Sequence, residues 1–357
     1  MSLLWCRGRG ILTMLDSKIP FLEKALDPGQ AQVQLQNAIP SLVQVTAATL
    51  VRHKLGRRAL VEYHAETVTG PLTVLGKLRA KGTDVASYQV QQALWRNGWA
   101  ADSGDRFSIP EPLGLVPDWH MTLQRKVPGI PATQLLPTEQ GIALAQRIAT
   151  LAHKLHHTPV TTAKTHTLAD ELAILRDRLP QVAERHPPWA TRIEHVLAAC
   201  DRLVTQFSPP LSHPPTLPPP HTGIHRDFYA DQILIDADDP GGQRLWLVDL
   251  DLYCLGSPAV DIGNFIAHIT EQSLRELGDA TALRDREVAL RETYLSANSD
   301  PSTGKSALAT TAREIDLYTV LTLVRHIHIS TRIPNRRPHT EALLSLSETR
   351  LANMLEQ

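Results

Sequence analysis

The polar residues His225, Arg226 and Asp227 begin a series whose types and order suit one kind of chemistry. The amide Gln232 lies five residues after Asp227, and Asp249 follows after sixteen more intervening residues. A carboxylate can accept the proton of a hydroxyl group, while an amide oxygen and a second carboxylate suit a hard cation such as Mg²⁺. Phosphoryl transfer uses these parts, because its catalysis consists mainly of positioning and charge neutralisation. The ordered set therefore predicts a phosphoryl-transfer site with Asp227 as its base.

Two short apolar runs surround these polar residues and predict how they are positioned. Residues 233–235 and 245–250 read as strands, and the Asp-, Pro- and Gly-rich residues 236–242 between them read as a turn. The resulting hairpin would hold Gln232 at its entry and Asp249 at its exit, so that the two side chains converge. An isolated Asp near Pro and Gly is more often a turn or cap residue. It is the complete ordered set that favours a site.

The segment from 221 to 268 resembles the catalytic core of the aminoglycoside phosphotransferase and choline kinase superfamily. Three motifs carry the resemblance. The family's H-G-D-x-x-x-x-N is similar to residues 225–232, its I-D-W/F-E/D to residues 248–251, and its G-D-P-x-x-D-L/I to residues 256–262. The resemblance implies an α+β fold of the bilobal, protein-kinase-like type, with a small β-rich N-lobe and a larger, mainly helical C-lobe.

The same resemblance implies roles for single residues. Asp227 is the implied catalytic base, and Asp261 is an implied buried residue that braces the catalytic loop. Gln232 stands where the family has Asn, which keeps the amide oxygen but adds one methylene, as in maltokinase-like sugar kinases. The candidate catalytic residues are Asp227, His225 and Arg226, and the candidate Mg²⁺ ligands are Gln232, Asp249 and Asp251.

Three β-rich runs precede this segment, at residues 43–54, 58–67 and 72–79. They predict an antiparallel sheet in a nucleotide-binding lobe. Lys77 on the third run stands where the superfamily has a phosphate-binding lysine, and a solvent-facing strand lysine is the alternative interpretation.

Two further segments are candidates for nucleotide contacts. The turn after residue 54 has one glycine among basic residues, which could approach phosphates by charge and by backbone amides, although a solvated hairpin tip would have the same composition. Residues 121–129 resemble the family's hinge, where backbone groups read the nucleotide base, and leave ATP and GTP both open. The candidates in these two segments are Gly56, Arg57, Gln124, Arg125 and Val127.

The composition narrows the partners and the compartment. A formal net charge of −1 gives no general attraction to nucleic acid or to a membrane surface. No apolar run approaches the roughly 18 residues of a membrane span, and the first residues do not match a signal peptide. Three widely separated cysteines without a Cys-x-x-Cys pair favour a reducing compartment and no structural zinc. We therefore expect a cytoplasmic protein.

The domain organisation follows from these segments. Residues 1–38 read as an N-terminal extension without assigned chemistry, 39–127 as the nucleotide-binding N-lobe and 128–357 as the helical C-lobe with the catalytic loop and acceptor site. The Pro-rich spacer at 208–220 reads as a tethering loop in preference to a docking site for a protein partner. Apolar periodicity predicts helices in the C-lobe, including those near 192–207, 271–277, 283–295, 312–330 and 339–354.

These patterns predict a small-molecule phosphotransferase. It would move the γ-phosphoryl group of ATP or GTP to a hydroxyl of a sugar-like or amino-alcohol acceptor, with Mg²⁺ bound. The alternative is a nucleotide-binding pseudokinase that acts as a scaffold or regulator. The turn with a single glycine, and the absence of a Glu on the helix after Lys77, favour that alternative. The intact set of Asp227, Gln232 and Asp249 counts against it.

Overall fold

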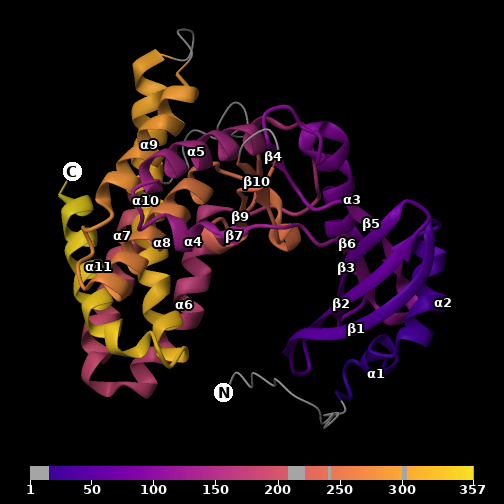
Figure 1. Ribbon diagram of the computed structural model, residues 1–357. Coiled ribbons are helices and arrows are strands. Elements are labelled where there is room, and N and C mark those ends of the chain that lie inside the picture. Colours follow the sequence, from indigo (N-terminus) through magenta and orange to yellow (C-terminus); the bar gives the residue numbers. More distant parts are fainter. Residues whose placement is uncertain (1–15, 208–221, 240–242, 300–303, 357) are drawn as a thin grey trace. The chain divides into compact units, whose positions relative to one another are not determined.

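The N-terminal strands form a sheet (Figure 1), and its second and third strands bury alternate side chains in a core. In β2 the side chains of Ala59, Val61, Tyr63 and Ala65 are buried, while their neighbours are more exposed. The sheet is antiparallel, in the order β1-β2-β3-β6-β5. Its strands are β1 (Leu42–Lys54), β2 (Arg58–Thr67), β3 (Gly70–Arg79), β5 (Pro112–Val116) and β6 (Met121–Arg125).

The computed structural model describes residues 16–207, 222–239, 243–299 and 304–356. The chain divides into two compact units. The first holds the residues up to Gln92 together with Pro110–Val127, and the second holds Ala93–Ile109 and the residues from Pro128 onward. The expected spacer at 208–220 lies outside the described residues, as do residues 1–15 of the expected extension.

The helices before the sheet belong to the core of the first unit. They are α1 (Leu22–Ala25) and α2 (Pro28–Ala38), and α2 begins where the Asp27 side chain accepts a hydrogen bond from the Gln30 backbone amide. Ile19 and Leu35 are buried in the same hydrophobic cluster as the sheet residues. Residues 16–38, expected as part of an extension, therefore cover the sheet. The helix that follows β3 is α3 (Val85–Leu94).

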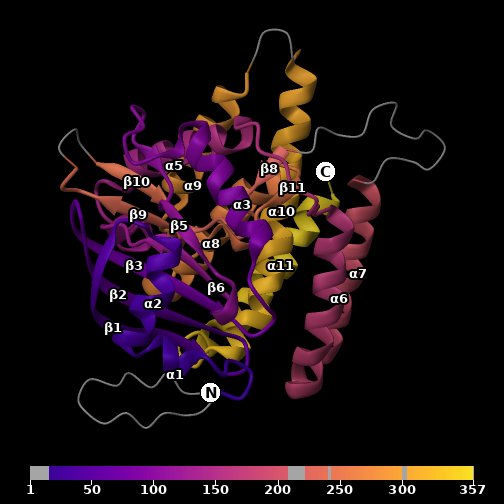
Figure 2. The same ribbon diagram turned by 90° about the vertical axis from the view of Figure 1, so that its right-hand side faces the viewer.

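The second unit is mainly helical, and its helices pack in pairs. Helix α8 packs against α10, α5 against α9, and α6 against α7, the last pair side by side in Figure 2. None of the described helices is both long and apolar enough to cross a membrane. The bounds of the helices are α4 (Ala132–Leu135), α5 (Gly141–His157), α6 (Leu168–Arg185), α7 (Ala190–Phe207), α8 (Ala259–Leu277), α9 (Arg284–Ala297), α10 (Gly304–Arg332) and α11 (Thr340–Leu355).

The predicted start of one helix near residue 271 is wrong, because α8 begins at Ala259, directly after Pro258. Gly263 made a boundary plausible in the sequence. In the structure Gly263 lies inside α8, and an added Cβ there would come within 2.7 Å of the Thr319 amide nitrogen and 2.8 Å of the Ile315 oxygen on α10. This glycine is therefore required by close helix packing and does not end a helix.

Two small sheets hold the segment that carries the polar motifs. Strand β9 (Ile233–Asp236) pairs antiparallel with β10 (Arg244–Leu247), which confirms the predicted hairpin, although its second strand ends at Leu247 and not at residue 250. The short strands β4 (Phe107–Ser108) and β7 (Ile130–Pro131) flank this pair. Strand β8 (Thr222–Ile224) pairs with β11 (Cys254–Gly256).

Candidate active site

A buried carboxylate fixes the loop that carries Asp227. The Asp261 side chain is fully buried in the first turn of α8 and accepts hydrogen bonds from the His225 amide and the Arg226 amide, each at 2.7 Å. The His156 imidazole contributes a third contact, Nε2 to Asp261 Oδ2, at 3.0 Å. The expectation that Asp261 braces the catalytic loop is thus confirmed.

Two residues of the predicted site have left-handed backbone conformations. Arg226 has a φ of 70° and Asp249 a φ of 62°, and neither is a glycine. This region costs an L residue on the order of 1–2 kcal/mol, so it persists only where surrounding contacts enforce it. At Arg226 those contacts are the hydrogen bonds to Asp261 from its own amide and from the preceding one. The turn at Arg226 sets the direction in which the next residue, Asp227, leaves the chain.

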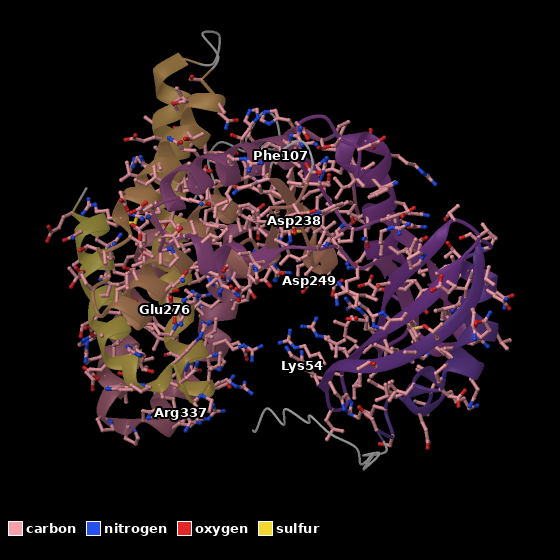
Figure 3. All side chains as sticks on the ribbon, viewed as in Figure 1. Lys54, Phe107, Asp238, Asp249, Glu276 and Arg337 are labelled. Carbon is pink, nitrogen blue, oxygen red and sulfur yellow. The ribbon has the colours of Figure 1, made fainter. Side chains whose placement is uncertain are left out.

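The β9–β10 hairpin brings the metal-ligand candidates to the catalytic loop. Its register pairs Leu247 with Ile233, and the Val248 amide donates to the Gln232 carbonyl at 2.9 Å. Gln232 therefore lies across from the residue that precedes Asp249. Figure 3 labels Asp249 at the exit of this hairpin and Asp238 in the turn at the other end.

Side-chain contacts complete this arrangement. The Gln232 amide nitrogen lies 3.4 Å from Asp227 Oδ2, a long hydrogen bond that joins the candidate base to a candidate metal ligand. The His225 Nε2 atom lies 2.9 Å from the Val248 carbonyl oxygen, so the histidine links the loop to the hairpin. The structure thus assigns His225 a positioning contact.

The donor atoms fit a hard cation. Since the Gln232 nitrogen is directed to Asp227, the carbonyl oxygen at the other end of the amide is directed away from that carboxylate. An amide oxygen and the Asp249 carboxylate are donors of the kind that Mg²⁺ accepts along with waters and substrate phosphates, and the binding of a metal by these two residues stays a prediction. Within the described residues, no group of three or more His, Cys, Asp or Glu side chains could hold a metal. Asp251, in the short 3-10 turn Leu250–Leu252, stays a predicted ligand.

A second brace, which the sequence did not predict, reaches the catalytic loop from three helices. The Asn264 side chain on α8 donates to the Phe228 carbonyl at 3.0 Å and accepts from Arg325 on α10 at 2.6 Å. Arg325 pairs with Glu171 on α6 at 3.2 Å, and Glu171 lies 2.7 Å from His166. Burial alone would raise the pKa of Glu171, but the hydrogen bond from His166 and the charge of Arg325 bring it below its ordinary value. The network holds the residue next to Asp227.

An uncharged aromatic column starts two residues after the candidate base. The Tyr229 ring stacks on His268 with centroids 4.4 Å apart, and His268 meets the edge of His326 at 4.3 Å. Burial, reinforced by the carboxylates of the loop, raises the pKa of Tyr229 to about 12. Burial, reinforced by nearby arginines, lowers the pKa of His326 to about 3 and that of His268 well below its usual value. All three rings are therefore neutral near pH 7.

The candidates for nucleotide contacts lie in the first unit. Lys77 is on β3, in register with Leu60 of β2 and Thr122 of β6. Gly56 and Arg57 form the turn between β1 and β2, beside the residue Lys54 that is labelled in Figure 3.

The predicted hinge residues lie at and just after the end of β6. Gln124 is buried and in register with Leu75 of β3, and Val127 is also buried. Arg125 pairs with the Glu111 carboxylate at 2.8 Å. Nucleotide binding by these residues stays a prediction.

Comparison with known proteins identifies the family. The model of the phosphotransferase enzyme family matches residues 76–295, a span that includes Lys77, the catalytic loop and Asp261. This chain belongs to the phosphotransferase enzyme family. The predicted superfamily and the prediction of a phosphotransferase enzyme are thereby confirmed. No curated protein matches the sequence.

Solved structures similar to this phosphotransferase confirm its fold class. A choline/ethanolamine kinase family protein from Mesorhizobium loti is 16% identical, with 92% of this chain and 99% of that chain covered and a TM-score of 0.53. Choline kinase from Cryptosporidium parvum Iowa II is 12% identical, with 94% of each chain covered and a TM-score of 0.51. An amicoumacin kinase in complex with AMP-PNP, Ca²⁺ and Ami is 12% identical, with 89% of this chain and 93% of that chain covered and a TM-score of 0.51. At such low identity the likeness concerns the fold.

Proposed function

We propose that this phosphotransferase moves the γ-phosphoryl group of ATP or GTP to a hydroxyl group of a sugar-like or amino-alcohol acceptor, with Mg²⁺ bound. One observation carries the proposal. The loop braced by Asp261 places Asp227 in contact with Gln232, and the β9–β10 hairpin brings Gln232 across from the residue before Asp249. Base, amide and second carboxylate are the parts that phosphoryl transfer requires.

Asp227 suits the role of base because one of its oxygens is uncommitted. Oδ2 accepts the long hydrogen bond from Gln232, and Oδ1 has no hydrogen-bond partner among the described residues. Asp227 is partly exposed, so an acceptor hydroxyl has access to it. The proton of that hydroxyl would pass to Oδ1 as the hydroxyl oxygen attacks the γ-phosphorus, while the bond from that phosphorus to the β–γ bridging oxygen breaks and the nucleoside diphosphate leaves. The hydrogen bond from Gln232 meanwhile keeps the carboxylate in one orientation.

Side-chain oxygen atoms of this chain would bind the metal, and its basic side chains would bind the phosphates. Gln232 and Asp249 are the proposed ligands, with Asp251 as a further candidate, and bound Mg²⁺ would neutralise phosphate charge. In the first unit, Lys77 and Arg57 supply the proposed cationic contacts. The amicoumacin kinase structure contains AMP-PNP, which supports a nucleoside triphosphate as the donor.

The chemical class of the acceptor is proposed from the uncharged ring of Tyr229, two residues after Asp227. Tyr229 is half-buried, and beyond the ring face that stacks on His268 it has a second face and a phenol hydroxyl, a combination that suits the faces and hydroxyl groups of a sugar-like molecule. The similar solved structures include kinases of choline, ethanolamine and amicoumacin, which supports a small-molecule acceptor. Gln232, shared in kind with maltokinase-like sugar kinases, also favours a sugar-like compound.

A transfer assay tests this function. Purified protein is incubated with ATP or GTP labelled in the γ-phosphate, with and without Mg²⁺, across a panel of sugars and amino alcohols. We expect Mg²⁺-dependent transfer to at least one class of acceptor. Asp249→Ala should abolish Mg²⁺-dependent nucleotide binding. Asp238→Ala is the matched control, because Asp238 is an exposed carboxylate at the opposite end of the same hairpin. Nucleotide binding without Mg²⁺ dependence or transfer to any acceptor would instead support the pseudokinase alternative.

A further inference from the structure

The turn between β1 and β2 is tied to a carboxylate that precedes the sheet. The Asp16 Oδ2 atom accepts hydrogen bonds from the Gly56 amide and from His53 Nε2, each at 2.8 Å. The Asp16 Oδ1 atom accepts from the Lys18 amide at 3.1 Å. The Asp16 side chain is only 2% exposed, so these contacts are enclosed. Forty positions separate Asp16 from Gly56 in the sequence.

The segment around Asp16 is anchored to the core of the first unit. The Ile19 amide donates to the Asp16 carbonyl at 2.9 Å, and Ile19 itself is buried among the sheet residues. The Lys18 side chain lies over the turn, since a Cβ added at Gly56 would be 3.4 Å from the Lys18 Cδ atom. Asp16 therefore has a fixed position from which to hold the turn.

Asp16 is charged at neutral pH. Burial alone would raise its pKa, but the hydrogen bonds from the Gly56 amide and from His53 outweigh burial, and its pKa lies below the ordinary value. Hydrogen bonds to a charged acceptor are stronger than those between neutral groups. The contact is thus a strong restraint on the turn.

The restraint changes what the turn can offer to a phosphate. The expected use of the Gly56 amide as a phosphate contact is not supported, since that amide donates to Asp16. The Arg57 amide donates to the Lys54 carbonyl at 2.9 Å, and the Arg57 carbonyl accepts from the Ala80 amide at 3.0 Å. The Arg57 side chain is exposed and has no ion pair or hydrogen bond among the described residues. The Gly56 and Arg57 amides are therefore engaged within the unit, whereas the Arg57 guanidinium is available to a phosphate.

We propose that Asp16 is a positioning residue for the nucleotide, which holds the β1–β2 turn through Gly56 and His53 so that the Arg57 guanidinium is directed to a nucleotide phosphate. The proposal rests on the proposed function, because it requires that the chain binds ATP or GTP. A guanidinium on a fixed turn loses less freedom on binding phosphate than one on a mobile turn. Asp16 thus acts through Arg57 and does not touch the nucleotide.

Equilibrium titration with Mg·ATP and Mg·GTP, combined with the kinetics of nucleotide hydrolysis, tests the proposal. We expect Asp16→Ala to raise the dissociation constant and KM for the nucleotide on the order of tenfold, as for a displaced binding group. The hydrolysis rate at saturating nucleotide should stay within about twofold, because Asp227 and the metal ligands belong to the other unit. Asp16→Asn should give an intermediate value, since its one remaining oxygen can still accept from Gly56 or His53.

Two further variants separate positioning from stability. Asp27→Ala removes the N-terminal cap of α2 in the same segment, which lowers thermal stability without contact to the turn. It should leave the nucleotide dissociation constant unchanged. Arg57→Ala should weaken binding on the order of tenfold in the wild-type background and by less than about twofold in the Asp16→Ala background, because the two residues act as one unit.

The outcomes distinguish the two proposals. If the wild-type chain binds nucleotide and Asp16→Ala binds it equally well or better, the role of Asp16 is refuted while the proposed function stands. Equal weakening in Asp16→Ala and Asp27→Ala, or additive effects of Asp16→Ala and Arg57→Ala, refutes it as well. A wild-type chain that binds neither ATP nor GTP refutes the proposed function, and the role of Asp16 with it.

Discussion

Substitution of Asp261 by Asn removes the charge and one acceptor oxygen of the side chain that braces the catalytic loop, with almost no change in the size of that side chain. The Asp261 carboxylate accepts two backbone amides at 2.7 Å and the His156 ring at 3.0 Å. An Asn side chain has only one acceptor oxygen, so its amide nitrogen must face a donor. The smaller loss occurs when the oxygen keeps its hydrogen bonds with His225 and His156 and the nitrogen faces the Arg226 amide.

The loss of stability follows from the hydrogen bond that the Arg226 amide donates to Asp261, which the substitution removes. A hydrogen bond to a charged group contributes about 1.5–3 kcal/mol, and removing the charge also weakens the two that remain. We therefore expect Asp261→Asn to lower the free energy of unfolding by about 3 kcal/mol. For a unit of this size that corresponds to a fall of roughly 6–12 °C in Tm. Released from the carboxylate, Arg226 can leave its left-handed conformation, which displaces Asp227 and should lower turnover on the order of 10²-fold.

The assay combines thermal unfolding with turnover measured well below Tm. Asp102→Asn is the matched control, because the exposed Asp102 undergoes the same chemical change and should shift stability by no more than about 0.5 kcal/mol. If Asp261→Asn had the Tm and turnover of the wild type, the brace would be wrong. A lower Tm with full turnover would mean that Asp261 stabilises the unit without positioning Asp227.

Two other substitutions test the metal ligand and the buried column. Gln232→Asn should lose the hydrogen bond to Asp227 and place its amide oxygen short of the metal. Turnover should therefore fall on the order of tenfold and recover in part with excess Mg²⁺. Unchanged turnover would mean that Gln232 is only a loop residue. The fold keeps His326 neutral down to about pH 3, whereas the unfolded chain protonates it near pH 6.5, so stability falls as the pH drops from 7.5 to 5.5, by about 1 kcal/mol for this residue. The free energy of unfolding, measured with urea at both pH values, should fall by about 1 kcal/mol less in His326→Gln than in the wild type. An identical pH dependence of stability in the variant and the wild type would contradict this assignment.

The features that the sequence predicted are those carried by short patterns. Strands β1 to β3 begin and end within two residues of the predicted runs, because a run of β-forming residues is a local property of the sequence. The β9–β10 hairpin was likewise predictable from two apolar runs around a polar turn. The match at residues 225–232 predicted the loop itself, because it specifies residue types at fixed spacing.

The features that the sequence did not predict depend on distant partners. Arg325 meets Asn264 across 61 positions, and His326 meets His268 across 58, because α8 packs against α10. No local pattern in either helix indicates that packing. Asp16 reads as an ordinary residue of an extension until the fold brings it to the β1–β2 turn. Gly263 led to the opposite error. The sequence suggested a helix boundary there, whereas the glycine lies inside α8 and is required by the close packing of α8 on α10.

The role of Asp227 as the base is the central assignment of the proposed phosphotransferase activity. The decisive measurement compares phosphoryl transfer and nucleotide binding in Asp227→Asn, with Asp231→Asn as a control in the same loop. We expect Asp227→Asn to transfer roughly 10²–10⁴-fold more slowly, while its nucleotide dissociation constant stays within about twofold of the wild-type value. The control should retain its turnover within a fewfold range. If Asp227→Asn kept most of the wild-type turnover, Asp227 would not be the base and the central assignment would be wrong.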